Sequence, residues 1–136
     1  MKFYVLDASA VLTFLSEKNP AVARKFKRVL REAENGKAKL YSTHLLPLEI
    51  GNGLRFSFTD EGLTTEIFKN FFELPIELLT FSPPQLQKIL DLSYQFKTSY
   101  YDTSYHLLAK LIGGIFITCD AKYFRKAKGF GNVELL

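Results

Sequence analysis

Two acidic residues follow apolar runs at positions where a chemical site could form. Asp7 comes directly after Phe3–Leu6, and Asp120 comes almost directly after Ile115–Thr118. Each run has the length and apolar character of a strand that is buried on both faces of a parallel sheet. Ligands of such sheets bind in the crevice outside the carboxyl ends of the strands, which is where these two carboxylates are expected.

Two further acidic residues fall in matching places. Asp102 lies in the first turn of a predicted helix that leads into the second apolar run, and Glu49 lies in the second turn of another predicted helix. If the two strands are neighbours, the four carboxylates converge at one edge. Two unit charges ~4 Å apart repel by about 4 kcal/mol at an effective dielectric of 20. Protonation relieves this repulsion, and so does a hard divalent cation such as Mg²⁺ or Mn²⁺, which could activate water at a phosphodiester.

Each of these acids also has a purely structural alternative. Asp102 and Asp120 could cap the helices that they open, and Asp7 could do the same, although Ser9 is the capping candidate for the helix after the first strand. His106 follows Asp102 by one turn and is expected to be a packing or surface residue, not a ligand.

The rest of the chain alternates predicted strands and helices. Strands are expected at 3–6, 39–42, 76–81, 115–118 and 133–135, and helices from 9, then at 21–34, 44–58 (capped by Thr43), 63–74, 83–96, 100–112 and 121–127. This alternation predicts an α/β fold, a three-layer αβα sandwich around a mostly parallel sheet. A length of 136 residues predicts a single domain spanning 1–136.

Composition narrows the class of protein. The chain is 47% hydrophobic and 24% charged, and no apolar run approaches the ~20 residues that span a bilayer. A single cysteine, Cys119, permits no internal disulfide and, with no signal-peptide pattern, predicts a cytoplasmic protein without a membrane partner. The net charge is +4, and the surface becomes more basic still if four acids gather in one site, which suits a polyanionic partner.

Four segments carry a resemblance to a known family. Val5–Ala10, Leu48–Leu54, Tyr100–Tyr105 and Thr118–Asp120 look like the successive motifs of PIN domains, in the same order and over nearly the whole chain. Among PIN domains, the chain most resembles the small VapC-type toxins of prokaryotic toxin–antitoxin pairs.

The resemblance implies a metal-dependent endoribonuclease that hydrolyses RNA phosphodiester bonds, with Mg²⁺ (or Mn²⁺) as cofactor. The metal-binding and catalytic acids would be Asp7, Glu49, Asp102 and Asp120. Ser9 and Thr118 would support metal or water by hydrogen bonds, and Asn52 would line the pocket near Glu49. The resemblance also implies a strand order of 3-2-1-4-5, a homodimer and a VapB-type antitoxin partner.

One departure from the family pattern concerns the Glu49 helix. Gly51 and Gly53 stand where the family more often has bulkier helix-forming residues. Glycine weakens a helix by up to about 1 kcal/mol relative to alanine, but it permits close approach of a neighbouring backbone.

Rival functions make different demands on the same residues. A haloacid-dehalogenase-like phosphatase would need a second Asp where Ser9 stands, and a receiver domain would need a pair of acids near the first strand. A non-catalytic PIN-fold module that binds RNA or protein, and a housekeeping RNA-processing nuclease, both stay open as alternatives.

An excess of aromatic residues predicts an interface. Five phenylalanines occur within 17 residues, which is more than one helix face of a small domain should bury: Phe56, Phe58, Phe68, Phe71 and Phe72. Exposed apolar patches mark interaction sites, and symmetric dimers are the commonest outcome. We therefore expect a homodimer through residues 45–74, with the antitoxin as the other candidate for this patch.

Overall fold

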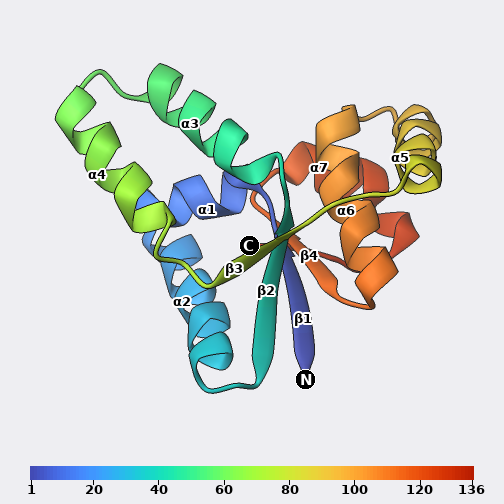
Figure 1. Cartoon of the computed structure of the whole chain (residues 1–136), viewed down its shortest axis with the longest axis horizontal. Helices are drawn as coiled ribbons and strands as arrows, with labels where there is room; N and C mark the ends of the chain where they lie inside the picture. The colour runs from blue at the N-terminus through green and yellow to red at the C-terminus, as the bar shows by residue number, and fades with distance from the viewer.

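A computed structural model describes residues 1–136 and is built around a five-stranded sheet in which every pair of neighbours is parallel (Figure 1). The strand order is β3-β2-β1-β4-β5, so the predicted order is confirmed. The strands are β1 (Lys2–Leu6), β2 (Ala38–Thr43), β3 (Ile76–Leu79), β4 (Ile115–Thr118) and β5 (Val133–Leu135).

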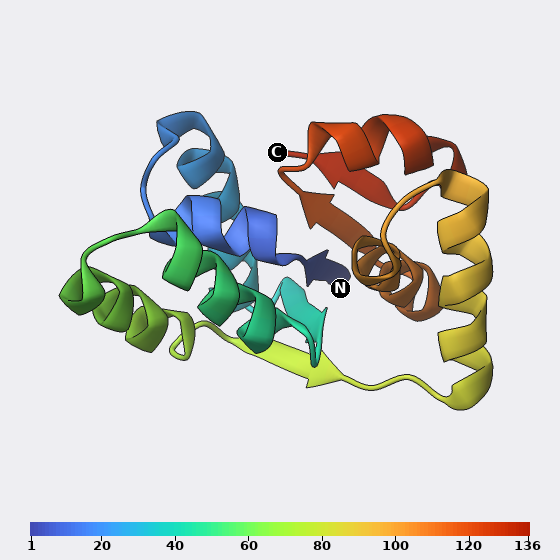
Figure 2. The same cartoon turned by 90° about the horizontal axis from the view of Figure 1, so that it is seen from above.

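Helices cover both faces of this sheet, which confirms the αβα sandwich. Figure 2 shows α1–α4 on one side of the strands and α5–α7 on the other. Successive crossovers step from β1 toward one edge and then, after β3, toward the other, so the covering helices change face. The helices are α1 (Ala8–Leu15), α2 (Pro20–Glu34), α3 (Leu46–Ser57), α4 (Glu61–Phe71), α5 (Pro83–Phe96), α6 (Tyr100–Ile112) and α7 (Ala121–Ala127), with a 3-10 turn at Lys128–Phe130. No helix combines the length and the apolar character needed to cross a membrane.

The central strand β1 anchors the core. Val5 and Leu6 are fully buried, and Leu6 pairs with Ile117 of β4 on one side of the strand. On the other side, the Ser42 hydroxyl of β2 donates a hydrogen bond of 2.6 Å to the Leu6 carbonyl. The strand ends of β1 and β4 are therefore held side by side, and the residues that follow them must be neighbours.

Two helix starts differ from the sequence-based expectation. The cap of α1 is Asp7, whose side chain accepts a hydrogen bond from the Ala10 amide, so the expectation for Ser9 was wrong. The α3 helix begins at Leu46 and not at 44, because Thr43 accepts the Leu45 amide just before the helix and Pro47 starts the first turn. Glu49 consequently lies in the first turn of α3 and not in the second.

Two further elements have shifted bounds. The α4 helix starts at Glu61, because Asp60 caps it through the Leu63 amide, and it ends at Phe71. The third strand stops at Leu79, two residues earlier than expected. The bounds of β4, α7 and β5 agree with the expectation.

The glycines of α3 do permit close packing. A Cβ atom at Gly53 would lie 2.5 Å from Cδ1 of Leu12 in α1, whereas one at Gly51 would lie 3.4 Å from the Phe68 ring in α4. The absence of a side chain at Gly53 thus lets α3 lie directly against α1, the helix that Asp7 caps.

Candidate active site

Asp7 is the most deeply buried of the candidate acids, with only 4% of its surface exposed. One carboxylate oxygen accepts hydrogen bonds from the Ser9 hydroxyl (2.7 Å) and the Ala10 amide (2.9 Å). The other accepts one from the Thr118 hydroxyl (2.6 Å). Burial raises the pKa of Asp7 to about 6, although the three hydrogen bonds oppose the rise. Its orientation is therefore fixed at the junction of β1 and β4.

A hydroxyl network ties the end of β4 to Asp7. Ser9 donates to Asp7 and accepts from the Cys119 amide at 3.0 Å. Thr118 donates to Asp7 and accepts from the Asp120 amide at 3.0 Å. Each hydroxyl donates its single proton to the Asp7 carboxylate. Ser9 and Thr118, the two residues expected to support the site, therefore contact Asp7 directly.

Asp102 is not the N-cap of the helix that it opens. The α6 helix is capped by Ser99, whose hydroxyl accepts the Asp102 amide at 3.0 Å. The Asp102 carboxylate is half-buried, and burial raises its pKa, while the charge of Asp120 adds to this rise. Ser99 therefore fills the N-cap position that Asp102 could have taken, whereas Asp120 does cap α7 through the Tyr123 amide at 2.9 Å.

Glu49 approaches from the opposite helical layer. It is partly buried in the first turn of α3, and the hydroxyl of Tyr105 donates to one of its oxygens at 2.8 Å. Burial raises the pKa of Glu49, and the negative charge of Asp102 raises it further. Asn52, one turn further along α3, is exposed.

Asp102 interacts electrostatically with each of the other three acids. Its charge acts on Asp7 and on Glu49, and the charge of Asp120 acts on Asp102 in turn. Asp102 and Asp120 also line one cavity of about 370 Å³, together with Ser99, Tyr123 and three lysines, Lys97, Lys122 and Lys126. We call this cavity the lysine pocket.

The four acids therefore belong to one edge of the molecule, beyond the carboxyl ends of β1, β2 and β4. This edge lies beside the point where the covering helices change face, the place at which open α/β sheets bind ligands.

The fold is shared with solved structures. PAE2754 from Pyrobaculum aerophilum superposes with a TM-score of 0.68 at 23% identity, over 94% of this chain and 87% of that chain. VapBC2 from Rickettsia felis, bound to a DNA fragment from their promoter, superposes with a TM-score of 0.70 at 12% identity, over 98% of this chain and 97% of that chain. The chain has a PIN-like fold. No protein-family model and no curated protein matches the sequence.

The donor chemistry of this site suits a hard divalent cation. All four acids offer oxygen, the ligand type that Mg²⁺ prefers, and Mg²⁺ is usually held by one or two carboxylates with water completing its shell. No group of three or more His, Cys, Asp or Glu side chains is gathered closely enough to enclose an ion. The arrangement thus fits an ion held by one or two carboxylates and water, and not a closed protein cage.

Two kinds of site residue were missed in the sequence. Tyr105 is fully buried, and its aromatic ring in a helix could not be told from a core residue, yet its hydroxyl reaches Glu49. The three lysines come from the end of α5 and from α7, so their spacing carries no signal.

His106 proves to be a packing residue, as expected. It is fully buried, and its ring nitrogens lie 2.9 Å from the Tyr123 hydroxyl and 2.6 Å from the Gly131 carbonyl. Because a carbonyl only accepts, Nε2 carries the proton and Nδ1 accepts from Tyr123 when the imidazole is neutral. Burial lowers the pKa of His106, which favours this neutral form.

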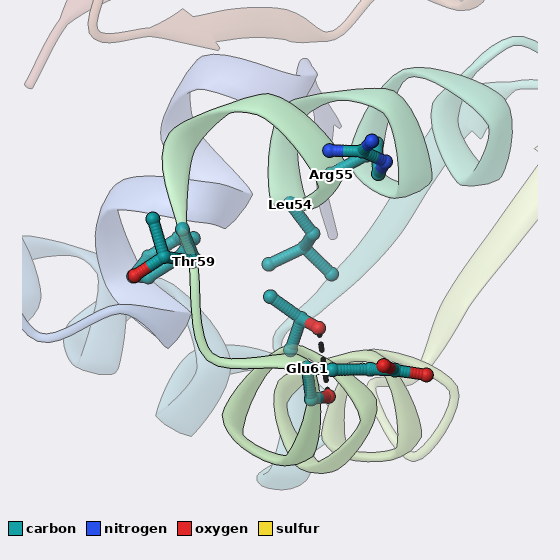
Figure 3. A pocket seen from close by; sticks show the side chains of 6 residues that line it. Leu54, Arg55, Thr59 and Glu61 are labelled. Carbon is teal, nitrogen blue, oxygen red and sulfur yellow. Dashed lines mark hydrogen bonds between the residues drawn. The ribbon is translucent and has the colours of Figure 1, made fainter.

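Another cavity, of about 440 Å³, lies away from the acidic edge. Figure 3 shows it between the last turn of α3, which supplies Leu54 and Arg55, and the start of α4, which supplies Glu61. The dashed line marks the Thr64 hydroxyl bonded to the Glu61 carbonyl, which ties the first turn of α4 together. Only one carboxylate lines this cavity, so it offers no counterpart to the acidic edge.

Proposed function

We propose that this protein is a metal-dependent endoribonuclease, and that it acts as the toxin of a VapBC-type toxin–antitoxin pair. The observation that carries the proposal is the state of Asp102. Its carboxylate is half-buried, is not the N-cap of α6, and shares a lysine-lined cavity with Asp120. A fold has little use for a half-buried carboxylate whose charge acts on neighbouring acids unless a cation or substrate compensates the repulsion.

The residues of the site would divide the work as follows. Asp7, held by three donors, would give one rigid oxygen ligand, and Asp102 would give a second that is open to the cavity. A Mg²⁺ or Mn²⁺ ion held there would supply an activated water and stabilise negative charge on the phosphodiester. The lysine pocket would neutralise the RNA backbone next to the acids. Tyr105 orients Glu49 at the rim of the site.

The first experiment measures cleavage of RNA with Mg²⁺ or Mn²⁺, with and without EDTA. We expect cleavage that EDTA abolishes and that Asp102→Asn reduces by about 100-fold or more. Asp91→Asn, an exposed acid of α5, is the matched control and should cut like the wild type. RNA cleavage that persists in Asp102→Asn would overturn the site, and a wild type that binds RNA without cutting it would favour a non-catalytic module.

Thermal unfolding tests the same site without relying on activity. Because Asp102→Asn removes a repulsive charge, the metal-free variant should be at least as stable as the wild type. A ligand that binds only the folded state stabilises it by about 2.7 kcal/mol at 100-fold excess over Kd, so Mn²⁺ should raise the melting temperature of the wild type and much less that of the variant. Asp102→Ala should behave like Asp102→Asn, because Ser99 supplies the cap.

The antitoxin is the second part of the proposal. It rests on the sequence motifs and on the similarity of the fold to VapBC2. A VapB-type protein encoded in the neighbouring reading frame should bind the chain and suppress cleavage. A chain that cuts RNA and has no such neighbour would instead be a housekeeping PIN nuclease.

A further inference from the structure

A second, uncharged cavity lies against the acidic edge. It measures about 400 Å³ and is lined mainly by apolar and aromatic side chains from the ends of β2 and β3 and from α3, α5 and α6. We call it the Tyr101 pocket; its walls include Leu48, Phe81, Leu86, Tyr100, Tyr101 and Ser104. It has the size and lining of a ligand site, with few polar groups among apolar ones.

The Tyr101 pocket and the acidic site alternate along the same two helices. On α6, Tyr101 and Ser104 face the pocket, while the intervening Asp102 faces the lysine pocket. On α3, Leu48 lines the pocket and the next residue, Glu49, belongs to the acidic site. The Tyr101 pocket and the lysine pocket thus lie on two sides of the first turn of α6.

The two pockets differ in charge in a way that selects the ligand. The Tyr101 pocket has no Lys, Arg, Asp or Glu in its lining, whereas the lysine pocket has three cations beside two acids. A ligand that fills both must join an uncharged part to an anionic part. A nucleotide has this composition, whereas a purely acidic peptide or a purely apolar helix does not.

The aromatic wall is prepared for stacking. The Tyr100 hydroxyl donates to the Leu86 carbonyl at 3.0 Å, which fixes Tyr100 against α5. Tyr101 stands edge-on to Tyr100, with ring centres 6.3 Å apart, and 55% of its surface is exposed. Leu48 supplies an exposed apolar side chain from the other helix layer.

We infer that the Tyr101 pocket binds one unstacked base of single-stranded RNA, next to the phosphodiester that is cut. This inference rests on the proposed function and adds the pocket that receives a base beside the acidic site. A base inside a duplex cannot leave its stack without an energetic cost, so single-stranded segments are the preferred substrate. Because any base can stack on an aromatic ring, we expect the pocket to distinguish single-stranded from double-stranded RNA more than it distinguishes one base from another.

The test combines a protein variant with a modified RNA. After the cut is mapped in a short single-stranded oligonucleotide, an abasic residue replaces each nucleotide that flanks it, one at a time. We expect the wild type to lose about tenfold in kcat/KM at one flanking position. Tyr101→Ala should lose about as much on intact RNA and nothing more on that abasic RNA, and Tyr101→Phe should resemble the wild type. Tyr94→Ala removes an exposed tyrosine of α5 that does not line the pocket and is the control.

Binding separates this inference from the proposed function. Fluorescence anisotropy in EDTA, with the same intact and abasic oligonucleotides, needs no cleavage. Weaker binding of the abasic RNA by the wild type, but not by Tyr101→Ala, supports the base pocket even if the protein never cuts RNA. Equal binding of both RNAs by the wild type overturns it. So does a Tyr101→Ala variant with unchanged RNA binding that has lost self-association or antitoxin binding, because a protein then occupies the pocket.

Discussion

Asp7 is an acid whose burial costs stability in the metal-free protein at neutral pH. Its pKa is about 6 in the folded state against 3.8 when unperturbed, so the folded state binds the proton more tightly. The contribution of Asp7 to the unfolding free energy is therefore most favourable below pH ~4. It falls by about 3 kcal/mol as the pH rises to ~6. Asp7→Asn keeps an acceptor for Ser9 and should lack this loss.

Urea unfolding in EDTA from pH 4 to pH 8 checks this prediction. The difference in unfolding free energy between Asp7→Asn and the wild type should grow in favour of the variant as the pH rises, and then level off above pH ~6. Asp91→Asn should follow the wild type throughout. Parallel curves for Asp7→Asn and the wild type would show that Asp7 is not buried as described.

Tyr105 holds Glu49 through a single hydrogen bond, and its removal should be measurable. Tyr105→Phe leaves a partly buried carboxylate without its donor, which costs about 1 kcal/mol of unfolding free energy. Loss of the donor also raises the pKa of Glu49, so the acid limb of the pH–cleavage profile should move to higher pH. Glu49→Gln should remove most of the effect of Tyr105→Phe, and additive effects would contradict the contact.

For single residues of the site, the sequence predicts correctly those contacts that follow from the pairing of neighbouring strands. Asp7 and Asp120 each follow a buried strand, so the pairing of β1 with β4 brings Ser9 and Thr118 into contact with Asp7. It fails for Tyr105 and for the lysines, whose contribution depends on how separate helices pack. It also left open whether Asp102 is a cap, which only the hydroxyl of Ser99 decides.

At the scale of elements, the path of α3 depends on its two glycines in different ways. Gly51→Ala should gain up to about 1 kcal/mol of unfolding free energy, because alanine favours the helix and its Cβ meets the Phe68 ring at an ordinary distance. Gly53→Ala has the same helix preference but displaces Leu12, so it should fall about 1 to 2 kcal/mol below Gly51→Ala. Urea unfolding of both variants tests this, and equal stabilities would mean that α1 and α3 are not in close contact.

Helix boundaries show which local signals were read well. The bounds of α7 and β5 were predicted correctly because Asp120 and a glycine-containing turn bracket them. The helix expected from residue 63 starts two residues earlier, because Asp60 caps a helix that contains Gly62 although glycine disfavours helices. Pro47 was overlooked as a first-turn residue, which put the start of α3 too early.

At the scale of the whole molecule, the aromatic excess divides into two groups. Phe71 belongs to the buried core, and the partly buried Phe58 and Phe68 pack against that core. Phe56 and Phe72, in contrast, are 76% and 65% exposed on α3 and at the end of α4. The predicted homodimer through residues 45–74 would therefore bury these two side chains.

Sedimentation at micromolar concentration checks the dimer. We expect the wild type at twice the chain mass of 15.6 kDa, and Phe56→Ser/Phe72→Ser close to the monomer mass. Exposed positions tolerate substitution within about 0.5 kcal/mol, so the double variant should stay folded. Tyr94→Ser, equally exposed on α5, should remain dimeric, and a monomeric wild type would refute the interface.

The order of the strands also governs when the acidic site exists during synthesis. The hydroxyl that holds Asp7 belongs to Thr118, 111 residues later, and Asp120 follows it. A ribosome adds about 5–20 residues per second, and the amino-terminal part of a nascent chain folds first. While β1 can pair with β2 early, its other neighbour, β4, is synthesised only after β2 and β3. A growing chain thus carries an incomplete site until β4 is available, and any nuclease activity begins only after Thr118 and Asp120 have left the exit tunnel.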